Sequence, residues 1–212
     1  MNYLAHLLLS GDDPEIQLGN FIGDFVRGRN PENIFPPKVA VGIHLHRMID
    51  GFTDSHPVVR ESKIRLRPTY RHYSAVIVDV FYDHYLAKNW EQYHAMPLND
   101  FANGFYQLAK SQEAWLPEKA RYVLPYMSRH DWLTNYSKIE GINRVLTGMA
   151  KRTPFASGME NATDDLIRHY EAFESEFLMF MPELLNASRE SHQKLYEQLA
   201  GELRVTDINL QP

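Results

Sequence analysis

Histidine and aspartate side chains occur at helical spacing inside segments that are otherwise apolar. His46 and Asp50 are four residues apart in the segment 39–52, and Asp79 and Asp83 have the same spacing in the segment 75–86. Residues four apart lie on one face of an α-helix, so each pair projects from an apolar surface. Burying these carboxylates without a counter-charge would cost several kcal/mol each, so a positive group has to meet them.

Two further segments place polar side chains in similar surroundings. His6 follows apolar residues near the start of the chain, and Asn20 and Asp24 are four apart among large apolar residues. The chain has no cysteine, so a metal would be held by His nitrogen and carboxylate oxygen. Such ligands suit Mn²⁺, Mg²⁺, Fe²⁺ or Zn²⁺, which activate water and polarise phosphoryl oxygens. The pattern therefore predicts a metal-dependent hydrolase site.

Each of these residues also has a structural alternative. One metal site would neutralise all the acids together, whereas the structural explanation requires a separate partner for each, and this favours the metal site. The alternatives are a hydrogen-bonded core position for His6 and His44, an ion-pair centre of Asp79 and Asp83 with Arg47, Arg60 or Arg71, a helix cap for Asp54, and a pair with Arg27 for Asp24.

The elements that must position these side chains are predicted to be helices, because strand-like alternation is scarce. Asp13 before Pro14 predicts an N-terminal cap, and Gly28 predicts a stop, which gives a helix over 14–27. The sequence thus predicts an all-α, single-domain bundle of roughly seven to nine helices over residues 1–212. Further helices are expected over 38–52, ending near Gly51, after Pro57, and over 74–93. Another begins at a cap at Asn99 and runs toward Trp115, and another runs from a capping box of Ser137 and Glu140 to Lys151. The last begins at Thr163 with a buried stripe of Leu166, Tyr170, Phe173, Phe177 and Phe180, and Pro182 is expected to kink or divide it.

Charge is unevenly distributed along the chain. The formal net charge is −5, yet residues 27–72 carry nine Lys or Arg side chains and only four Asp or Glu. This basic window, from Arg27 to Arg71, predicts contact with an acidic partner or phosphate; the alternative is a solvated helix face. The N-terminal segment lacks a basic leader, and no apolar run approaches the roughly 18 residues that span a bilayer. We therefore expect a cytoplasmic protein that binds neither membrane nor nucleic acid.

The same residues resemble the acyl carrier protein phosphodiesterase family. The likeness continues through residues 141–152 and the aromatic helix 164–182, so it covers essentially the whole chain. The matching motifs are Asn2-Tyr3-Leu4-Ala5-His6, Gly19-Asn20 with Gly23-Asp24-Phe25-Val26-Arg27-Gly28, Gly42-Ile43-His44-Leu45-His46-Arg47 with Ile49-Asp50 and Thr53-Asp54, and Tyr82-Asp83-His84.

The resemblance implies removal of the 4'-phosphopantetheine arm from holo acyl carrier protein. It also implies a divalent metal, typically Mn²⁺; Mg²⁺ and Fe²⁺ are the other candidates. It also implies a chemical relation to the helical His-Asp phosphohydrolases, although Asp83-His84 reverses the order of that pair. Acyl carrier proteins are small and acidic, so the window from Arg27 to Arg71 is expected to dock the carrier.

We assign the site residues from helical geometry. The expected mechanism is attack of a metal-activated water on the phosphodiester. Asp79 is expected to be a further ligand or to orient a ligating His, Arg27 and Arg47 to stabilise the phosphoryl oxygens, and His84 or His44 to protonate the leaving oxygen. Two alternatives are a phosphohydrolase of nucleotides or other small phosphodiesters, and a non-catalytic helical binding protein. The predicted metal ligands are His6, Asp24, His46, Asp50 and Asp83, and the predicted catalytic residues are Asp24, Asp79, His84, Arg27 and Arg47.

Overall fold

Helices make up every regular element of the part of the chain that the structure describes. This computed structural model describes residues 1–208, with side chains to residue 198. The all-α class is therefore confirmed. The helices are α1 (Tyr3–Leu9), α2 (Pro14–Ile22), α3 (Pro37–Ser55), α4 (Pro57–Tyr70), α5 (Ser74–Lys88), α6 (Leu98–Ser111), α7 (Glu118–Arg129), α8 (Trp132–Asn135), α9 (Ile139–Ala150), α10 (Ala162–Arg168) and α11 (Tyr170–Ile208), with short 3₁₀ turns between several of them. This division is finer than the expected seven to nine helices because short segments such as α8 stand apart.

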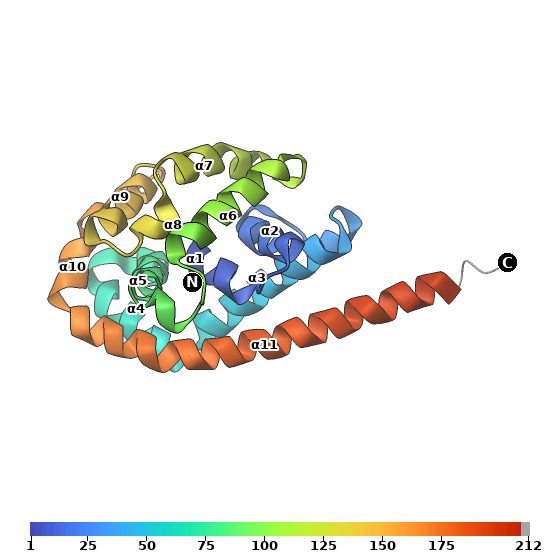
Figure 1. The fold of residues 1–212 in the computed structure, drawn as a ribbon. Coiled ribbons are helices and arrows are strands. Elements are labelled where there is room, and N and C mark those ends of the chain that lie inside the picture. Colours follow the sequence, from blue (N-terminus) through green and yellow to red (C-terminus); the bar gives the residue numbers. More distant parts are fainter. Residues whose placement is uncertain (209–212) are drawn as a thin grey trace.

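The helices surround α1, which lies in the middle of the molecule (Figure 1). α1 contacts α2, α5 and α11, while α6 to α10 form an arc that leads into α11 (Figure 1). α11 runs along one side, and its C-terminal end extends beyond the other helices (Figure 1). None of the helices over residues 1–208 is both long and apolar enough to cross a membrane.

The central helix α5 is buried on nearly all sides. Ile77, Val80 and Phe81 are fully buried, as expected for a helix that is apolar all round. The predicted aromatic stripe packs against it: the Tyr82 and Phe177 rings lie 5.8 Å apart and meet edge to face. α5 therefore has a fixed position from which its polar side chains meet α1.

α2 and α3 cross backbone against backbone at two glycines. A Cβ atom added to Gly19 would stand 2.0 Å from the Val39 carbonyl oxygen, and one added to Gly42 would stand 2.3 Å from the Ile16 carbonyl oxygen. Only glycine fits at both positions. The close crossing brings the end of α2 within hydrogen-bond reach of the side chains on α3.

Several expected boundaries differ from the structure. The helix predicted over 14–27 begins as expected, with Asp13 accepting bonds from the amides of Glu15 and Ile16, but it ends at Ile22 and continues as a 3₁₀ turn, η1 (Gly23–Phe25). Gly28 has a φ of +93°, a backbone conformation that favours glycine. The helix predicted over 38–52 instead passes through Gly51, because packing sustains it to Ser55.

The expected caps farther along the chain are wrong, because the side chains bond elsewhere. Ser137 donates to the Thr134 carbonyl instead of capping α9, whose N-cap residue is Lys138. Asn99 lies within α6, and Thr163 lies within α10. The helix predicted over 74–93 ends at Lys88, and α11 runs through Pro182 without a break.

Candidate metal centre

Two histidines and an aspartate from α1 and α3 converge in one cluster. The side chains of His6 and His46 are buried, and one ligand atom from each lies within 4.8 Å of the others and of an Asp50 oxygen. His6 Nε2 lies 3.2 Å from Asp50 Oδ1, and His46 Nε2 lies 3.1 Å from Asp50 Oδ2. The imidazole rings stack with centroids 4.1 Å apart. These three residues form a group that could hold a metal ion.

Hydrogen bonds from α2 orient both imidazoles. His6 Nδ1 lies 2.8 Å from the side-chain oxygen of Asn20, and His46 Nδ1 lies 2.8 Å from the main-chain oxygen of the same residue. Both oxygens are acceptors, so each Nδ1 carries the proton in the neutral imidazole. Each Nε2 therefore presents its lone pair to the cluster.

Lone pairs that face carboxylates require a cation between them. His6 Nε2 is buried and has no hydrogen-bond partner, although Asp50 is 3.2 Å away. A proton or a metal ion would satisfy this contact, and His nitrogen with carboxylate oxygen is the donor set of Mn²⁺, Fe²⁺ and Zn²⁺. The residues present thus fit a divalent metal.

Asp24 completes the cluster from η1. Its Oδ1 lies 3.2 Å from His46 Nε2, and 62% of its side chain is exposed. η1 approaches closely because Gly23 has no side chain: a Cβ there would stand 2.3 Å from His46 Cγ. The shift from α-helix to 3₁₀ turn at Gly23 thus sets the position of Asp24.

The electrostatics of the cluster favour one positive charge among the carboxylates. Burial lowers the pKa of His46, but hydrogen bonds with Asp24 and Asp50 outweigh it and raise that pKa to about 9. Burial raises the pKa of Asp50, yet its close contacts with the imidazoles of His46 and His6 bring that pKa far below the usual range. The hydrogen bond with His46 lowers the pKa of the Asp24 carboxyl group. Without a metal, a proton on His46 supplies that charge.

A cavity of about 350 Å³ opens beside the cluster. Asp50 and Asp24 belong both to the cavity wall and to the cluster, so the cluster faces the cavity through them. Four carboxylates, two hydroxyl groups and one imidazole line it: Asp24, Asp50, Asp54, Asp79, Tyr3, Thr53 and His72.

Asp83 and Asp79 lie next to the N-terminal segment and not among the histidines. Both oxygens of the buried Asp83 accept bonds from main-chain amides, Leu4 N at 2.8 Å and Ala5 N at 3.3 Å. Asp79 pairs with the Met1 amino group at 3.0 Å. Asp83 therefore anchors the start of α1 and is not part of the group formed by His6, His46 and Asp50. Asp79 lines the cavity and pairs with Met1, not with either histidine.

The two histidines expected to donate a proton are occupied elsewhere. His84 is buried, with Nδ1 2.8 Å from the Tyr136 carbonyl oxygen and Nε2 2.8 Å from the Tyr170 hydroxyl. His44 pairs with Glu32 on the surface at 3.2 Å. Neither imidazole lines the cavity.

The basic window does not form one continuous face. Arg65 pairs with the buried Glu176 at 2.6 Å, Lys63 pairs with Asp54 at 2.7 Å, and Lys38 with Asp13. Because Asp54 pairs with Lys63, it does not serve as the helix cap considered above. Arg47 is half-buried and donates to the carbonyls of Val26 and Arg29, which holds the loop after η1. Within the basic window, the exposed basic residues that form no ion pair with the described side chains are Arg27, Arg29, Arg60, Arg67 and Arg71.

Sequence reasoning assigned no role to Asn20 or His72. The spacing of Asn20 from Asp24 was visible, but an amide is not a strong metal ligand, and its function depends on the α2–α3 crossing. His72 follows Arg71, a residue with φ +53° in the left-handed region. No pattern in the sequence indicates that this turn lies at the cavity.

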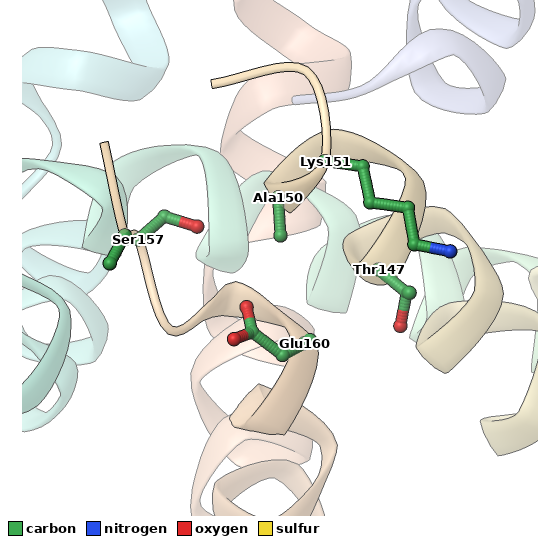
Figure 2. Close-up of a pocket in the computed structure, with 6 residues that line it drawn as sticks. Thr147, Ala150, Lys151, Ser157 and Glu160 are labelled. Carbon is green, nitrogen blue, oxygen red and sulfur yellow. The ribbon is translucent and has the colours of Figure 1, made fainter. Parts of the chain in front are cut away.

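A second hollow, of about 260 Å³, lies between α9 and the turn at residues 156–161. Its wall includes Lys151, which directly follows α9, and Glu160 from the 3₁₀ turn before α10 (Figure 2). None of the candidate metal-binding groups in the described side chains lies there. The site built for chemistry is therefore the cavity beside His6 and His46.

The fold and the site define an all-helical protein with a histidine and aspartate cluster able to hold a metal ion. A family model described as acyl carrier protein phosphodiesterase matches residues 1–184. The chain belongs to this family, whose name is that of a phosphodiesterase, a kind of hydrolase.

Relatives named acyl carrier protein phosphodiesterase cover nearly the whole chain. The one from Escherichia coli O139:H28 (strain E24377A / ETEC) is 36% identical over 196 residues, which are 92% of this chain and 100% of the relative. The one from Enterobacter sp. (strain 638) is 38% identical over 190 residues, 87% of this chain and 96% of the relative. No solved structure matches the chain.

Proposed function

We propose that this protein hydrolyses the phosphodiester of holo acyl carrier protein, releasing 4'-phosphopantetheine and leaving the carrier's serine free. The observation that carries the proposal is the pair of buried Nε2 atoms, on His6 and His46, that face carboxylates beside a cavity. Family membership supplies the substrate, because the matching relatives are named for acyl carrier protein.

His6, His46 and Asp50 would hold a divalent ion, and Asp24 is the nearest further carboxylate. When bound, such an ion lowers the pKa of water and polarises a phosphoryl oxygen. Mn²⁺ is our first candidate, with Mg²⁺ and Fe²⁺ next. The protein holds the imidazoles in one tautomer and keeps Asp50 between them, so the donor atoms converge before the ion arrives.

The charges around the cavity support a role for a cation in binding a phosphodiester. Asp79 is paired with the Met1 amino group, and Asp54 with Lys63, which leaves Asp24 and Asp50 with histidine partners. A phosphodiester anion would be repelled by those two carboxylates in the absence of added positive charge. A divalent ion at the cluster reverses the sign of this interaction.

His72 is our candidate for protonating the serine oxygen that leaves. It is the one imidazole among the residues that line the described cavity, and it is exposed. An imidazole that faces the cavity can donate a proton to the leaving oxygen, which is the role of a general acid. His72 belongs to the 3₁₀ turn η3 (Arg71–Tyr73), whereas Asp24 belongs to η1. The two residues therefore approach the cavity from different elements.

The two ends of the basic window lie within three residues of cavity residues in the sequence, and they would provide a docking surface for an acidic carrier. Arg27 follows Asp24 by three residues, and Arg71 directly precedes His72. Both arginines are exposed. We propose that Arg27, Arg29 and Arg71 steer the carrier toward the cavity, while Arg47 holds the loop that carries the first two.

A substrate comparison tests this function. Holo acyl carrier protein, a nucleotide phosphodiester and a simple aryl phosphodiester are each incubated with the protein and Mn²⁺. We expect turnover of the carrier and little of the small compounds, because only the carrier contacts the arginines. Preferred turnover of a small compound would indicate a phosphohydrolase of nucleotides or similar esters. Loss of all turnover together with absence of Mn²⁺ binding would indicate a binding protein.

A further inference from the structure

Asn20 contacts both histidines of the cluster but cannot reach the cavity. Its side chain is fully buried, and it does not line the cavity wall. The main-chain oxygen accepts from His46 Nδ1, and the side-chain oxygen accepts from His6 Nδ1. One residue on α2 therefore contacts imidazoles from two other helices, α1 and α3.

The orientation of the Asn20 amide is fixed by its other contacts. Asn20 Nδ2 lies 2.8 Å from the His6 carbonyl oxygen and 2.9 Å from Ser10 Oγ. Ser10 donates its own proton to the same carbonyl, at 2.8 Å, so its oxygen is free to accept from the amide. Nδ2 thus has two acceptors, and reversing the amide would place an acceptor against each of them. The oxygen must face His6 Nδ1.

We infer that Asn20 is a positioning residue of the metal centre, setting the tautomer and the ring orientation of both ligating histidines. This inference rests on the proposed metal-dependent function and assigns the residue that prepares its ligands. If His6 carried its proton on Nε2, that nitrogen would be lost as a metal ligand. Partners of this kind are worth about 10- to 100-fold in metal affinity.

Replacing Asn20 should act differently on the two histidines, since one is held by the side chain and the other by the main chain. Asn20→Ala removes the acceptor for His6 but keeps the carbonyl that holds His46. We expect Mn²⁺ affinity, measured by calorimetry, to fall about 10- to 100-fold. Nitrogen NMR of the metal-free protein should show His6 in mixed tautomers. Asn20→Asp keeps an acceptor oxygen for His6 Nδ1, so it should restore the Nδ1–H form of His6 and part of the affinity, while its second oxygen, facing the His6 carbonyl oxygen, should lower the melting temperature.

Asn89→Ala is the matched control, because Asn89 donates to the Tyr85 carbonyl at the end of α5 and touches neither histidine. It should leave Mn²⁺ affinity and the tautomer of His6 unchanged. Unaltered Mn²⁺ affinity in a folded Asn20→Ala variant would overturn the inference. If that variant does not fold, the wild-type spectrum decides: an Nε2–H form of His6 overturns the inference, and an Nδ1–H form supports it.

These outcomes are separable from the proposed function. A wild-type protein that binds Mn²⁺ yet leaves the carrier intact would contradict the substrate and not the role of Asn20. An Asn20→Ala variant with wild-type affinity and tautomer would contradict the role of Asn20 and leave the substrate standing.

Discussion

Gly23 lies directly against the imidazole of His46, at a distance that leaves no room for a methyl group. A Cβ on Gly23 would be 2.3 Å from His46 Cγ and 2.6 Å from Cβ of the same residue. This contact ties the 3₁₀ turn that carries Asp24 to the helix that carries His46 and Asp50. The geometry of the metal centre thus depends on a residue with no functional group.

Gly23→Ala should damage the metal centre more than the fold. The added methyl must displace η1 or the buried imidazole, at a cost of about 1–3 kcal/mol in the free energy of unfolding. Asp24 moves with η1, so Mn²⁺ affinity should fall as well. Thermal unfolding and calorimetry measure the two effects. Gly104→Ala is the control, since its Cβ would meet nothing within 4 Å in the exposed middle of α6; we expect it to stabilise by about 0.5–1 kcal/mol.

His72, which lies just before α5, and His84, which lies on α5, should separate catalysis from packing. His72→Gln should lower kcat by about 100- to 10,000-fold, the range for loss of a general acid, with Mn²⁺ affinity unchanged. His84→Gln should lower the melting temperature and spare kcat, because the imidazole of His84 bonds only Tyr136 and Tyr170. Steady-state kinetics on holo carrier protein check both variants. Full activity in His72→Gln would remove that residue from the mechanism.

Asp83 should make stability depend on pH. Burial raises the pKa of its carboxyl from 3.8 to about 7, although bonds from the Leu4 and Ala5 amides oppose the shift. The folded state therefore holds the proton more tightly than the unfolded state between these values. The contribution of Asp83 to stability is complete below 3.8 and is lost as the pH rises through about 7.

Urea unfolding of wild type and Asp83→Asn across that range measures this contribution. The difference in unfolding free energy between the two proteins should change with pH between 3.8 and about 7 and become constant above it. A difference that does not vary with pH would show that Asp83 does not titrate there.

The exposed arginines Arg27 and Arg71 should act on carrier binding and not on chemistry. Arg27→Ala and Arg71→Ala should raise KM for the carrier and weaken its dependence on salt, while kcat changes little. Lys38→Ala is the control, because Lys38 is already paired with Asp13, the N-cap residue of α2. An effect of Lys38→Ala as large as those of the arginines would show that net charge, and not the position of the arginines, governs docking.

Much of the fold could be predicted because helical periodicity survives in the sequence. The buried stripe of Phe173, Phe177 and Phe180 is confirmed, and so is the Asp13 cap. Helix ends were predicted less well, since packing extends α3 through Gly51 and the His46 contact converts the end of α2 to a 3₁₀ turn at Gly23. These are tertiary effects, which local propensity does not contain.

The site was predictable where two ligands share one helix. His46 and Asp50 are four residues apart on α3, and the structure places them in contact. Asp79 and Asp83 have the same spacing on α5 but face the Met1 amino group and the first amides of α1. Spacing shows that side chains share a face, whereas the partner across that face depends on how the helices are packed.

The most direct test of the account is the intact mass of holo acyl carrier protein after incubation with this protein and Mn²⁺, beside a reaction with Asp50→Asn. Asp50 contacts both histidines and is itself a proposed ligand. The variant should therefore lose more Mn²⁺ affinity than the loss of about 10- to 100-fold that is typical when a residue that orients a ligand is replaced. The account predicts that the wild type removes the mass of 4'-phosphopantetheine from the carrier and that Asp50→Asn does not. A carrier of unchanged mass with the Mn²⁺-loaded wild type, or equal loss with the variant, would contradict it.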